Sequence, residues 1–273
     1  MPEGPEIKRQ ADEIHGALAG EVARSVWFAF PKLRSAGERL EGRRIDEVRP
    51  RGKALLVCFD GGLVIYTHNQ LYGRWYVRKS GQPPNTRRSL RLRIATDRGA
   101  AFLYSASTIE LLDRAELDRH PFLGRLGPDV LAPETTVDEL RARLRDERFR
   151  RRRLAALLLD QTFLAGLGNY LRSEILFHAA VDPTARPVDL EARQVRRLAD
   201  SIGLITLRAY EDRGVTNDPR VVRRARREGR RRRDFRHYVF ARAGQPCPRC
   251  GSTIEKTELA GRRLYWCRPC QEP

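Results

Sequence analysis

The chain has 273 residues, which is enough for one large domain or for two domains with apolar cores of their own. Its 53 lysines and arginines outnumber 35 aspartates and glutamates, so the formal charge is +18 and a polyanionic partner is indicated. The sequence contains no apolar run that spans a bilayer, no signal-peptide pattern and no basic amphipathic helix with aromatic anchors. These absences argue against membrane and secreted proteins and favour a cytoplasmic protein that binds nucleic acid.

The first six residues, Met1-Pro2-Glu3-Gly4-Pro5-Glu6, place a proline directly after the initiator methionine. Once Met1 is removed, Pro2 is an N-terminal secondary amine, and α-amino groups titrate near pH ~7.7–8.0, so it is nucleophilic at neutral pH. Such an amine attacks an electrophilic carbon and forms an iminium ion. Glu3 and Glu6 are candidate proton donors or acceptors beside it. The alternative interpretation is an ordinary protein start with two solvated glutamates.

A helix and a series of short strands are predicted next. Apolar residues at three- and four-residue spacings predict a helix over residues 7–18, which ends at Gly20. Short alternating or β-branched runs over residues 22–104 predict the strands of a sandwich or barrel. Cys58 lies within one of these apolar runs, and we expect it to pack in the core.

Helices replace strands after residue 121, and a domain boundary is expected within residues 124–133. Thr136 and Glu139 form the capping box of a helix, and the helical pattern continues to residue 207. Gly166-Leu-Gly168-Asn169 precedes one of these helices, where free backbone N–H groups and the Asn169 amide can bind phosphate. An ordinary turn between helices is the alternative.

Ten arginines between Arg220 and Arg236 form the densest basic stretch of the chain. A block of like charges is typical of a disordered loop. Because arginines also add sequence-independent affinity for a nucleic-acid backbone, we expect a mobile loop that strengthens DNA binding.

Four of the five cysteines lie near the C-terminus, as Cys247-Pro-Arg-Cys250 and Cys267-Arg-Pro-Cys270. This C-x2-C-x16-C-x2-C spacing predicts one tetrahedral Zn²⁺ held by four thiolates, with a hairpin between the two pairs. Two disulfides are the alternative, which the absence of a secretion signal disfavours. A closed site of this kind is structural, because no position is left open for water.

Taken together, the motifs resemble those of the formamidopyrimidine-DNA glycosylase/endonuclease VIII family over essentially the whole chain. They are Pro2-Glu3-Gly4-Pro5-Glu6, Arg51-Gly52-Lys53, His68-Asn69-Gln70-Leu71-Tyr72-Gly73, His120-Pro121-Phe122-Leu123, Gly166-Leu-Gly168-Asn169 and Arg262-Arg263-Leu264-Tyr265-Trp266-Cys267. The resemblance implies an α+β multidomain fold. A catalytic β-sandwich with an N-terminal helix is expected over residues 1–124, a helix–two-turn–helix DNA-binding domain over 133–237 and a β-hairpin zinc finger over 238–273.

The resemblance also implies roles for individual residues. Pro2 attacks C1′ of a damaged nucleotide and displaces the base. Glu3 donates a proton to the opening sugar, and Glu6 supports this pair. Lys53 contacts phosphate and assists elimination, while Arg262 of the zinc finger binds the phosphate beside the lesion and is linked to the second elimination.

Further positions are implied to contact DNA, namely Gln70, Arg125 and Asn169. The chemistry agrees, since C1′ of a stacked nucleotide cannot be reached until the nucleotide is flipped out of the duplex. Gln70-Leu71-Tyr72 is a polar, apolar and aromatic triplet that is able to wedge into the vacated stack.

Two features bear on the substrate class within the family. Gly4 stands where the oxidised-purine branch typically has leucine, and the wedge triplet is contiguous, so oxidised pyrimidines such as thymine glycol are favoured. The alternatives are an oxidised-purine glycosylase of the same family and a non-catalytic damage-binding protein. The prediction is a monomeric, bifunctional DNA glycosylase/AP lyase of base excision repair, which cuts damaged double-stranded DNA by β,δ-elimination. We expect one structural Zn²⁺, a cytoplasmic, nucleoid-associated location and no membrane partner.

Overall fold

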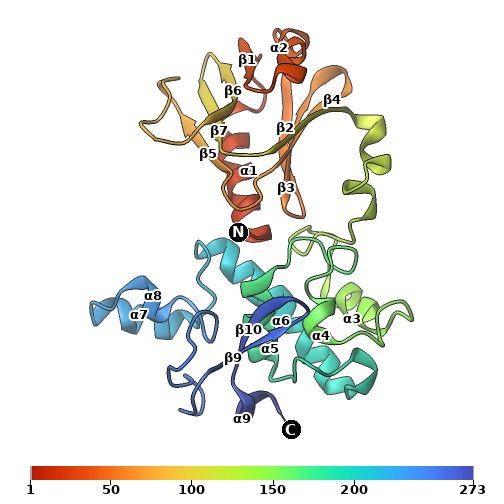
Figure 1. Cartoon of the computed structure of the whole chain (residues 1–273), viewed down its shortest axis with the longest axis vertical. Coiled ribbons are helices and arrows are strands. Elements are labelled where there is room, and N and C mark those ends of the chain that lie inside the picture. The colour runs from red at the N-terminus through yellow and green to blue at the C-terminus, as the bar shows by residue number, and fades with distance from the viewer. Residues whose placement is uncertain (1, 273) are drawn as a thin grey trace. The chain divides into compact units, whose positions relative to one another are not determined.

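The computed structural model describes residues 2–272, and the chain divides into two compact units between Arg125 and Leu126. Unit 1, which precedes this point, is built mainly from two antiparallel sheets, and unit 2 mainly from helices (Figure 1). Met1, whose removal the N-terminal chemistry requires, lies outside the described residues. Among the helices that the structure describes, none is long and apolar enough to cross a membrane.

Each sheet of unit 1 has four strands. The first has the order β2 (Ile45–Arg51), β3 (Ala54–Phe59), β4 (Leu63–His68) and β8 (Thr108–Asp113). The second has the order β1 (Ser25–Phe28), β6 (Leu90–Thr96), β7 (Gly99–Tyr104) and β5 (Arg74–Arg78). Apolar side chains from both sheets, from α1 (Gly4–Leu18) and from α2 (Arg34–Leu40) share one core, so the predicted sandwich with its N-terminal helix is confirmed.

Helix α1 begins at Gly4 and not at residue 7, where its apolar periodicity starts. Glu3 and Glu6 form a capping box across the first turn. Pro5 lies within that turn, where its missing N–H costs no helical hydrogen bond. The buried face has the predicted spacing and consists of Ile7, Ala11, Ile14 and Leu18. Because α1 contacts strands of both sheets, the N-terminal end of the chain is fixed on the core of unit 1 (Figure 1).

The core of unit 2 lies among α3 (Val137–Arg145), α4 (Leu154–Leu157), α5 (Asn169–Ala179) and α6 (Ala192–Glu211). Thr136 caps α3, because its hydroxyl accepts a hydrogen bond from the Glu139 N–H at 3.2 Å. Only this half of the predicted capping box is formed, since the Thr136 N–H donates to the Glu134 carbonyl at 3.0 Å. Near the C-terminus, β9 (Glu255–Leu259) and β10 (Arg262–Trp266) form a hairpin that is followed by α9 (Arg268–Gln271). Leu264 and Trp266 of β10 are buried in the helical core, so the hairpin packs against α5.

The arginine-rich stretch differs from its prediction. It forms two helices, α7 (Pro219–Arg227) and α8 (Arg232–Phe235), so the expected loop is wrong. The physical reason is a small core of its own, in which the buried Val222, Ala225 and Phe235 pack with Val215. Arginine is also a good helix former, so a dense arginine block does not oppose helix formation by propensity.

Candidate active site

The N-terminal residues are held in place by the first turn of α1. The Glu3 N–H donates to Glu6 Oε2 at 3.0 Å, and the Glu3 carboxylate accepts a hydrogen bond from the Glu6 N–H. Only 4% of Glu3 is exposed, whereas Pro2 is half-buried. The two glutamates therefore fix each other, and the carboxyl group of Glu3 lies one residue from the predicted nucleophile in a defined geometry.

Lys53 lies in the two-residue turn between β2 and β3, where Arg51 pairs with Ala54. Gly52 begins this turn with φ +61°, a conformation that favours glycine. His68 ends β4 opposite Ala54, and burial together with the nearby Lys53 charge lowers the pKa of His68. A positive charge is thus placed at the end of the sheet where β4 leads into the predicted wedge loop.

The wedge loop, residues 69–73, connects β4 of one sheet with β5 of the other. Asn69 is buried and donates from Nδ2 to Gln10 Oε1 of α1 at 2.7 Å, and its carbonyl accepts from the Gly73 N–H at 2.7 Å. The His68 ring accepts at Nδ1 from the Gln70 N–H at 3.1 Å. Hydrogen bonds therefore close the base of the loop on the sheet and on α1.

The tip of the wedge loop is apolar and exposed. Leu71 is 60% exposed and Tyr72 is 70% exposed, so two adjacent large side chains present apolar surface to solvent. Gln70 has φ +48°. Its Nε2 donates to Thr108 Oγ1 at 3.0 Å, and its Oε1 accepts from Ser107 Oγ at 2.6 Å. The triplet thus has the predicted form, with a fixed polar residue followed by a protruding apolar and an aromatic one.

Gly73→Ala is expected to destabilise unit 1, because an added Cβ would lie 2.6 Å from both the carbonyl oxygen and the α-carbon of Asn69. An overpacked backbone contact of this kind costs about 1–3 kcal/mol, which denaturant unfolding measures directly. Gly203→Ala is the matched control, since its Cβ would meet no atom within 4 Å and the site lies inside α6. We expect the control to leave stability unchanged or to raise it. Equal free energies of unfolding for Gly73→Ala and the original chain would contradict the packing described for this loop.

The four C-terminal cysteines lie together in unit 2, as their spacing predicts. Their sulfur atoms all lie within 4.8 Å of one another, with Cys247 Sγ 3.9 Å from Cys270 Sγ and Cys250 Sγ 3.5 Å from Cys267 Sγ. A tetrahedral zinc with Zn–S bonds of about 2.3 Å places its sulfurs about 3.8 Å apart, whereas a disulfide requires about 2.0 Å. The thiolates therefore fit one structural Zn²⁺, and the disulfide alternative is excluded.

Arg262 lies at the tip of the zinc-finger hairpin. Ala260 and Gly261 have φ +56° and +67° and form the two-residue turn between Leu259 and Arg262, as in a type I′ hairpin. The Arg262 side chain is exposed directly after this turn. The hairpin thus presents a guanidinium group, the side chain best suited to bidentate phosphate binding.

Asn169 begins α5, and its side chain contacts the same hairpin. Its Nδ2 donates to the Arg263 carbonyl at 2.7 Å, so one of its two N–H groups is used within the protein. Asn169 and Arg262 were predicted from separate motifs, and the structure links them through the start of β10. The N-terminus of α5 and the hairpin tip therefore form one surface of unit 2.

The sequence prediction missed Arg172, a buried residue that connects the two parts of this surface by hydrogen bonds. Arg172 is fully buried in α5, and its guanidinium donates to the carbonyls of Leu259, Arg262 and Arg263 at 3.0, 3.2 and 3.1 Å and to Asn169 Oδ1 at 2.8 Å. Both strands of the hairpin tip are thereby fixed to α5. The available signal was two charged residues, Arg172 and Glu174, within a stretch whose other residues up to Phe177 are mostly apolar.

Glu174, two residues further along α5, was also missed. It is fully buried, and its carboxylate accepts from the N–H groups of Tyr238, Val239 and Phe240 at 2.7–2.9 Å and from Thr216 Oγ1 at 2.5 Å. Burial raises the pKa of this carboxyl, and the hydrogen bonds oppose that shift. Burial also lowers the pKa of the neighbouring His237 to about 3, so its ring is neutral and bonds to Thr216 at 3.0 Å. This buried network connects α5 to the chain that enters the zinc finger.

Arg125, the remaining predicted DNA contact, ends unit 1. It is exposed in a short 3-10 turn (Leu123–Arg125), and its Nε donates to the Pro121 carbonyl at 2.8 Å. The neighbouring His120 ring accepts at Nδ1 from the N–H groups of Phe122 and Leu123, which fixes the turn. The His120 motif therefore supports the backbone that carries Arg125.

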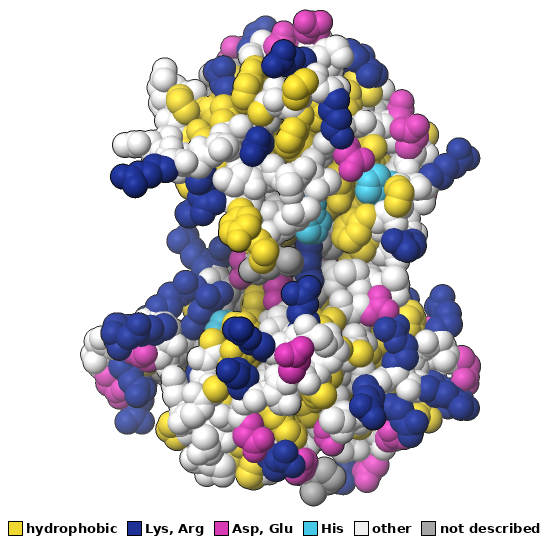
Figure 2. Space-filling view, viewed as in Figure 1, with side chains coloured by type: hydrophobic (Ala, Val, Ile, Leu, Met, Phe, Trp, Pro, Cys, Tyr) yellow, Lys and Arg dark blue, Asp and Glu magenta, His cyan; other side chains and the backbone are white. Residues whose placement is uncertain are grey.

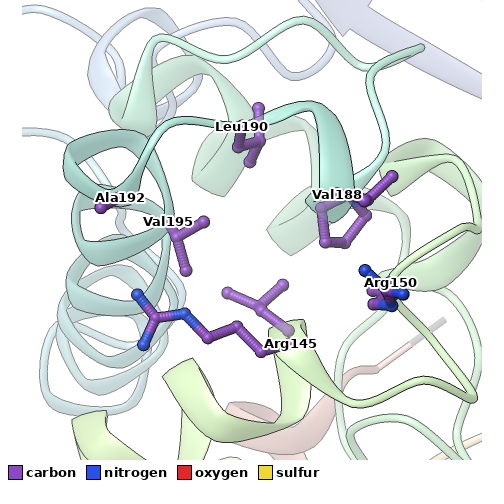
Figure 3. Close-up of a pocket in the computed structure, with 8 residues that line it drawn as sticks. Arg145, Arg150, Val188, Leu190, Ala192 and Val195 are labelled. Atoms are coloured by element: carbon purple, nitrogen blue, oxygen red, sulfur yellow. The ribbon is translucent and has the colours of Figure 1, made fainter.

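One cavity in unit 2 contains none of the predicted site residues. It has a volume of about 310 Å³, and Figure 3 shows Arg145 extending towards Val195 with Arg150 on the other side. Its lining consists of Leu144, Arg145, Arg150, Pro187, Val188, Leu190, Ala192 and Val195. Two arginines stand among its apolar lining residues, and none of the predicted site residues contributes to it.

Comparison with known families assigns all three parts of the chain. The family model "Formamidopyrimidine-DNA glycosylase N-terminal domain" matches residues 1–107. "Formamidopyrimidine-DNA glycosylase H2TH domain" matches residues 126–219, and "Zinc finger found in FPG and IleRS" matches residues 244–273. The predicted sandwich, helix–two-turn–helix region and zinc finger are thereby confirmed.

Similar proteins match over the full length. Endonuclease 8 of Escherichia coli O17:K52:H18 is 47% identical and that of Klebsiella pneumoniae 46%, each covering 99% of this chain and 100% of the relative. The solved structure of MutM (Fpg) from Thermus thermophilus has a TM-score of 0.77 at 28% identity and covers 99% of this chain and 98% of its own. Lactococcus lactis Fpg in complex with N7-benzyl-Fapy-dG DNA has a TM-score of 0.79 at 23% identity, with full coverage of both chains, and shows the shared fold.

Proposed function

Because the chain belongs to the formamidopyrimidine-DNA glycosylase/endonuclease VIII family and is a bifunctional DNA glycosylase and AP lyase of base excision repair, we propose that Pro2 is its nucleophile. The observation that carries this proposal is the placement of Pro2 directly before the capping box of α1, beside the buried Glu3. The full-length relatives are Endonuclease 8 proteins, which favours oxidised pyrimidines over oxidised purines as substrates.

In the proposed reaction, the Pro2 nitrogen forms a bond to C1′ of the flipped nucleotide, and the bond from C1′ to the damaged base breaks. The base leaves with the electron pair of that bond and takes up the proton that the Pro2 nitrogen loses. Glu3 donates a proton to the ring oxygen as the sugar opens, which leaves an iminium ion between Pro2 and C1′. The iminium withdraws electrons and acidifies the neighbouring C2′–H. Loss of that proton expels the 3′ phosphate, a second elimination expels the 5′ phosphate, and hydrolysis of the iminium releases Pro2.

Lys53 is proposed to bind the phosphate that leaves. Its ammonium group lies on the hairpin turn between β2 and β3, close enough to His68 for its charge to lower the pKa of that ring. A cation at this position stabilises the charge that develops on a departing phosphate. Glu6 is proposed to act indirectly, since its carboxylate accepts the Glu3 N–H and so positions its neighbour.

The wedge loop is proposed to fill the gap that the flipped nucleotide leaves. Leu71 and Tyr72 supply apolar surface that replaces lost base stacking, and Gln70 supplies polar groups beside the orphaned base. Arg125 and Asn169 are proposed as contacts to the DNA backbone. A single chain of two compact units carries all of these groups, so we propose that the enzyme works as a monomer in the cytoplasm on nucleoid DNA.

Arg262 is proposed to bind the phosphate beside the lesion, and zinc holds it in place. Cys267→Ser is therefore expected to weaken binding of lesion duplex by about 10- to 100-fold, the worth of one charge-assisted hydrogen bond, and to leave more product at the β-elimination stage. The checks are zinc content, duplex affinity and the ratio of β- to δ-elimination products. Cys58→Ser is the matched control, because Cys58 is buried in β3 of unit 1 and is not one of the four clustered cysteines. Zinc-free Cys267→Ser with full duplex affinity would contradict the role of the finger.

Excision rates with duplexes that carry thymine glycol or 8-oxoguanine test the substrate class. Single-turnover excision of thymine glycol is expected to be faster by about 10-fold or more. Faster excision of 8-oxoguanine would move the chain to the purine branch. Tight binding of both lesions without excision would indicate a damage-binding protein instead.

A further inference from the structure

The α7–α8 arm, defined as residues 214–236, is a folded feature of unit 2 that the proposed reaction does not use. The structure describes it as two short helices around a core of Val215, Val222, Ala225 and Phe235. The Asp218 carboxylate caps α7 by accepting from the Arg220 N–H at 2.7 Å. One side of the arm's helices therefore faces this small apolar core, and the opposite side faces outward.

Hydrogen bonds attach the base of the arm to the body of unit 2. The Thr216 N–H donates to the Arg236 carbonyl at 2.9 Å, and Arg236 Nε donates to the Gly214 carbonyl at 2.8 Å, which closes the segment on itself. The Thr216 hydroxyl also donates to the buried Glu174 of α5. The arm is thus connected to the same helix that begins with Asn169, the predicted DNA contact.

The arm carries a large uncompensated positive charge. Residues 214–236 contain ten arginines and three acids, a formal charge of 10 − 3 = +7. Glu228 pairs with Arg224 at 2.7 Å, and Asp234 lies 3.6–3.7 Å from Arg231 and Arg233. In the described part of the chain, no ion pair involves four exposed arginines of α7, which are Arg220, Arg223, Arg226 and Arg227.

Three of these arginines share the outer face of α7. At 100° per residue, Arg220, Arg223 and Arg227 lie within about 60° of one another, on the side opposite Val222 and Ala225. They span about 10 Å along the helix axis, which corresponds to about three phosphates of one DNA strand. Figure 2 shows Lys and Arg side chains gathered on this part of unit 2.

We infer that the outer face of α7 binds the phosphate backbone of duplex DNA outside the lesion site, without reading its sequence. The guanidinium group suits phosphate geometry better than ammonium does. A membrane surface requires apolar anchors beside the charges, but Val222 and Ala225 face the core of the arm and only Val221 is exposed. The inference rests on the proposed function only in taking duplex DNA as the substrate.

The test replaces Arg220, Arg223 and Arg227 together by glutamine, which keeps helix propensity high. The full chain is titrated with an undamaged duplex of about 30 base pairs between 50 and 200 mM salt. Loss of three phosphate contacts makes the slope of log affinity against log salt about 2.7 less steep. The fold-decrease in duplex affinity between 50 and 200 mM salt is then about 40 times smaller for the variant than for the original chain. The triple Arg→Lys variant is expected to retain most of the slope, because the charges remain.

A control variant removes the same charge elsewhere. Arg34→Gln and Arg39→Gln on α2, combined with Arg196→Gln on α6, change three exposed arginines outside the arm. We expect this control to leave the salt slope within about one unit of the original value. An equal fall in both triple variants would reduce the inference to net charge, and an unchanged slope in the arm variant would overturn it. The inference would also be overturned if the arm variant lost affinity for anionic vesicles while its affinity for duplex DNA stayed unchanged.

Single-turnover excision at saturating lesion duplex separates this inference from the proposed function. The arm variant is expected to excise thymine glycol at the original rate, because the arm contains no residue of the proposed catalytic group. If the original chain does not excise thymine glycol, the role of Pro2 is refuted. If the salt slope nevertheless falls in the arm variant, the role of the arm is retained. A fall in the saturated excision rate of the arm variant would place the arm in the lesion site and contradict the inference.

Discussion

Protein with an uncleaved N-terminal extension is expected to lose base excision and strand cutting while it still binds duplex DNA. An added residue converts the Pro2 nitrogen to an amide, whose lone pair is delocalised into the carbonyl and no longer attacks carbon. Because iminium formation is the first step of the proposed reaction, both activities should fall by at least about 10³-fold, as is typical when a covalent nucleophile is removed.

The matched control is the same extension joined through a protease site that leaves Pro2 as the first residue after cleavage. Cleavage is expected to restore excision and cutting together, and intact mass confirms the new N-terminus. Duplex affinity serves as the check on folding before and after cleavage. Full excision activity in the uncleaved protein would show that another group attacks the sugar.

Glu3→Gln is expected to separate the two activities of the enzyme. Base removal needs a proton at the sugar as the ring opens, and a general acid contributes typically 10²–10⁴-fold. A preformed abasic site exists partly as the open aldehyde, so its cutting does not depend on that proton. Excision of thymine glycol should therefore fall by about 10²–10⁴-fold, whereas cutting at an abasic site falls less than about 10-fold.

In the capping box, the Glu3 side chain accepts a hydrogen bond from the Glu6 N–H. The carbonyl oxygen of glutamine accepts the same hydrogen bond, so we expect the substitution to preserve the fold. Glu6→Gln is the companion variant, because its side chain positions Glu3 and donates no proton in the proposed reaction. Its excision rate should exceed that of Glu3→Gln. Equal losses of excision and abasic-site cutting in Glu3→Gln would contradict the role of Glu3 as the acid.

The predictable part of the site is local in sequence. Pro2 and Glu3 are adjacent, the wedge triplet is contiguous, and the cysteine pairs have a spacing that a single metal imposes. Each of these groups was identified because its chemistry is contained in a short motif. The sandwich followed from alternating strands in the same way.

The missed residues act through distant partners. Arg172 contacts carbonyls that lie 87–91 residues further along the chain, and Glu174 accepts N–H groups 64–66 residues away. No local pattern specifies such backbone partners, and a charged residue in an apolar helix gives only a hint of burial. The α7–α8 arm was missed for another reason, because its core needs just a few apolar residues among many arginines.

Borohydride trapping followed by peptide mapping tests the central claim most directly. The enzyme, with Pro2 as its first residue, is incubated with a thymine glycol duplex and reduced, and the peptide that carries DNA is identified by mass. We predict one covalent complex, attached at the nitrogen of Pro2. Attachment at Lys53, or the absence of any complex while the base is still released, would contradict the account.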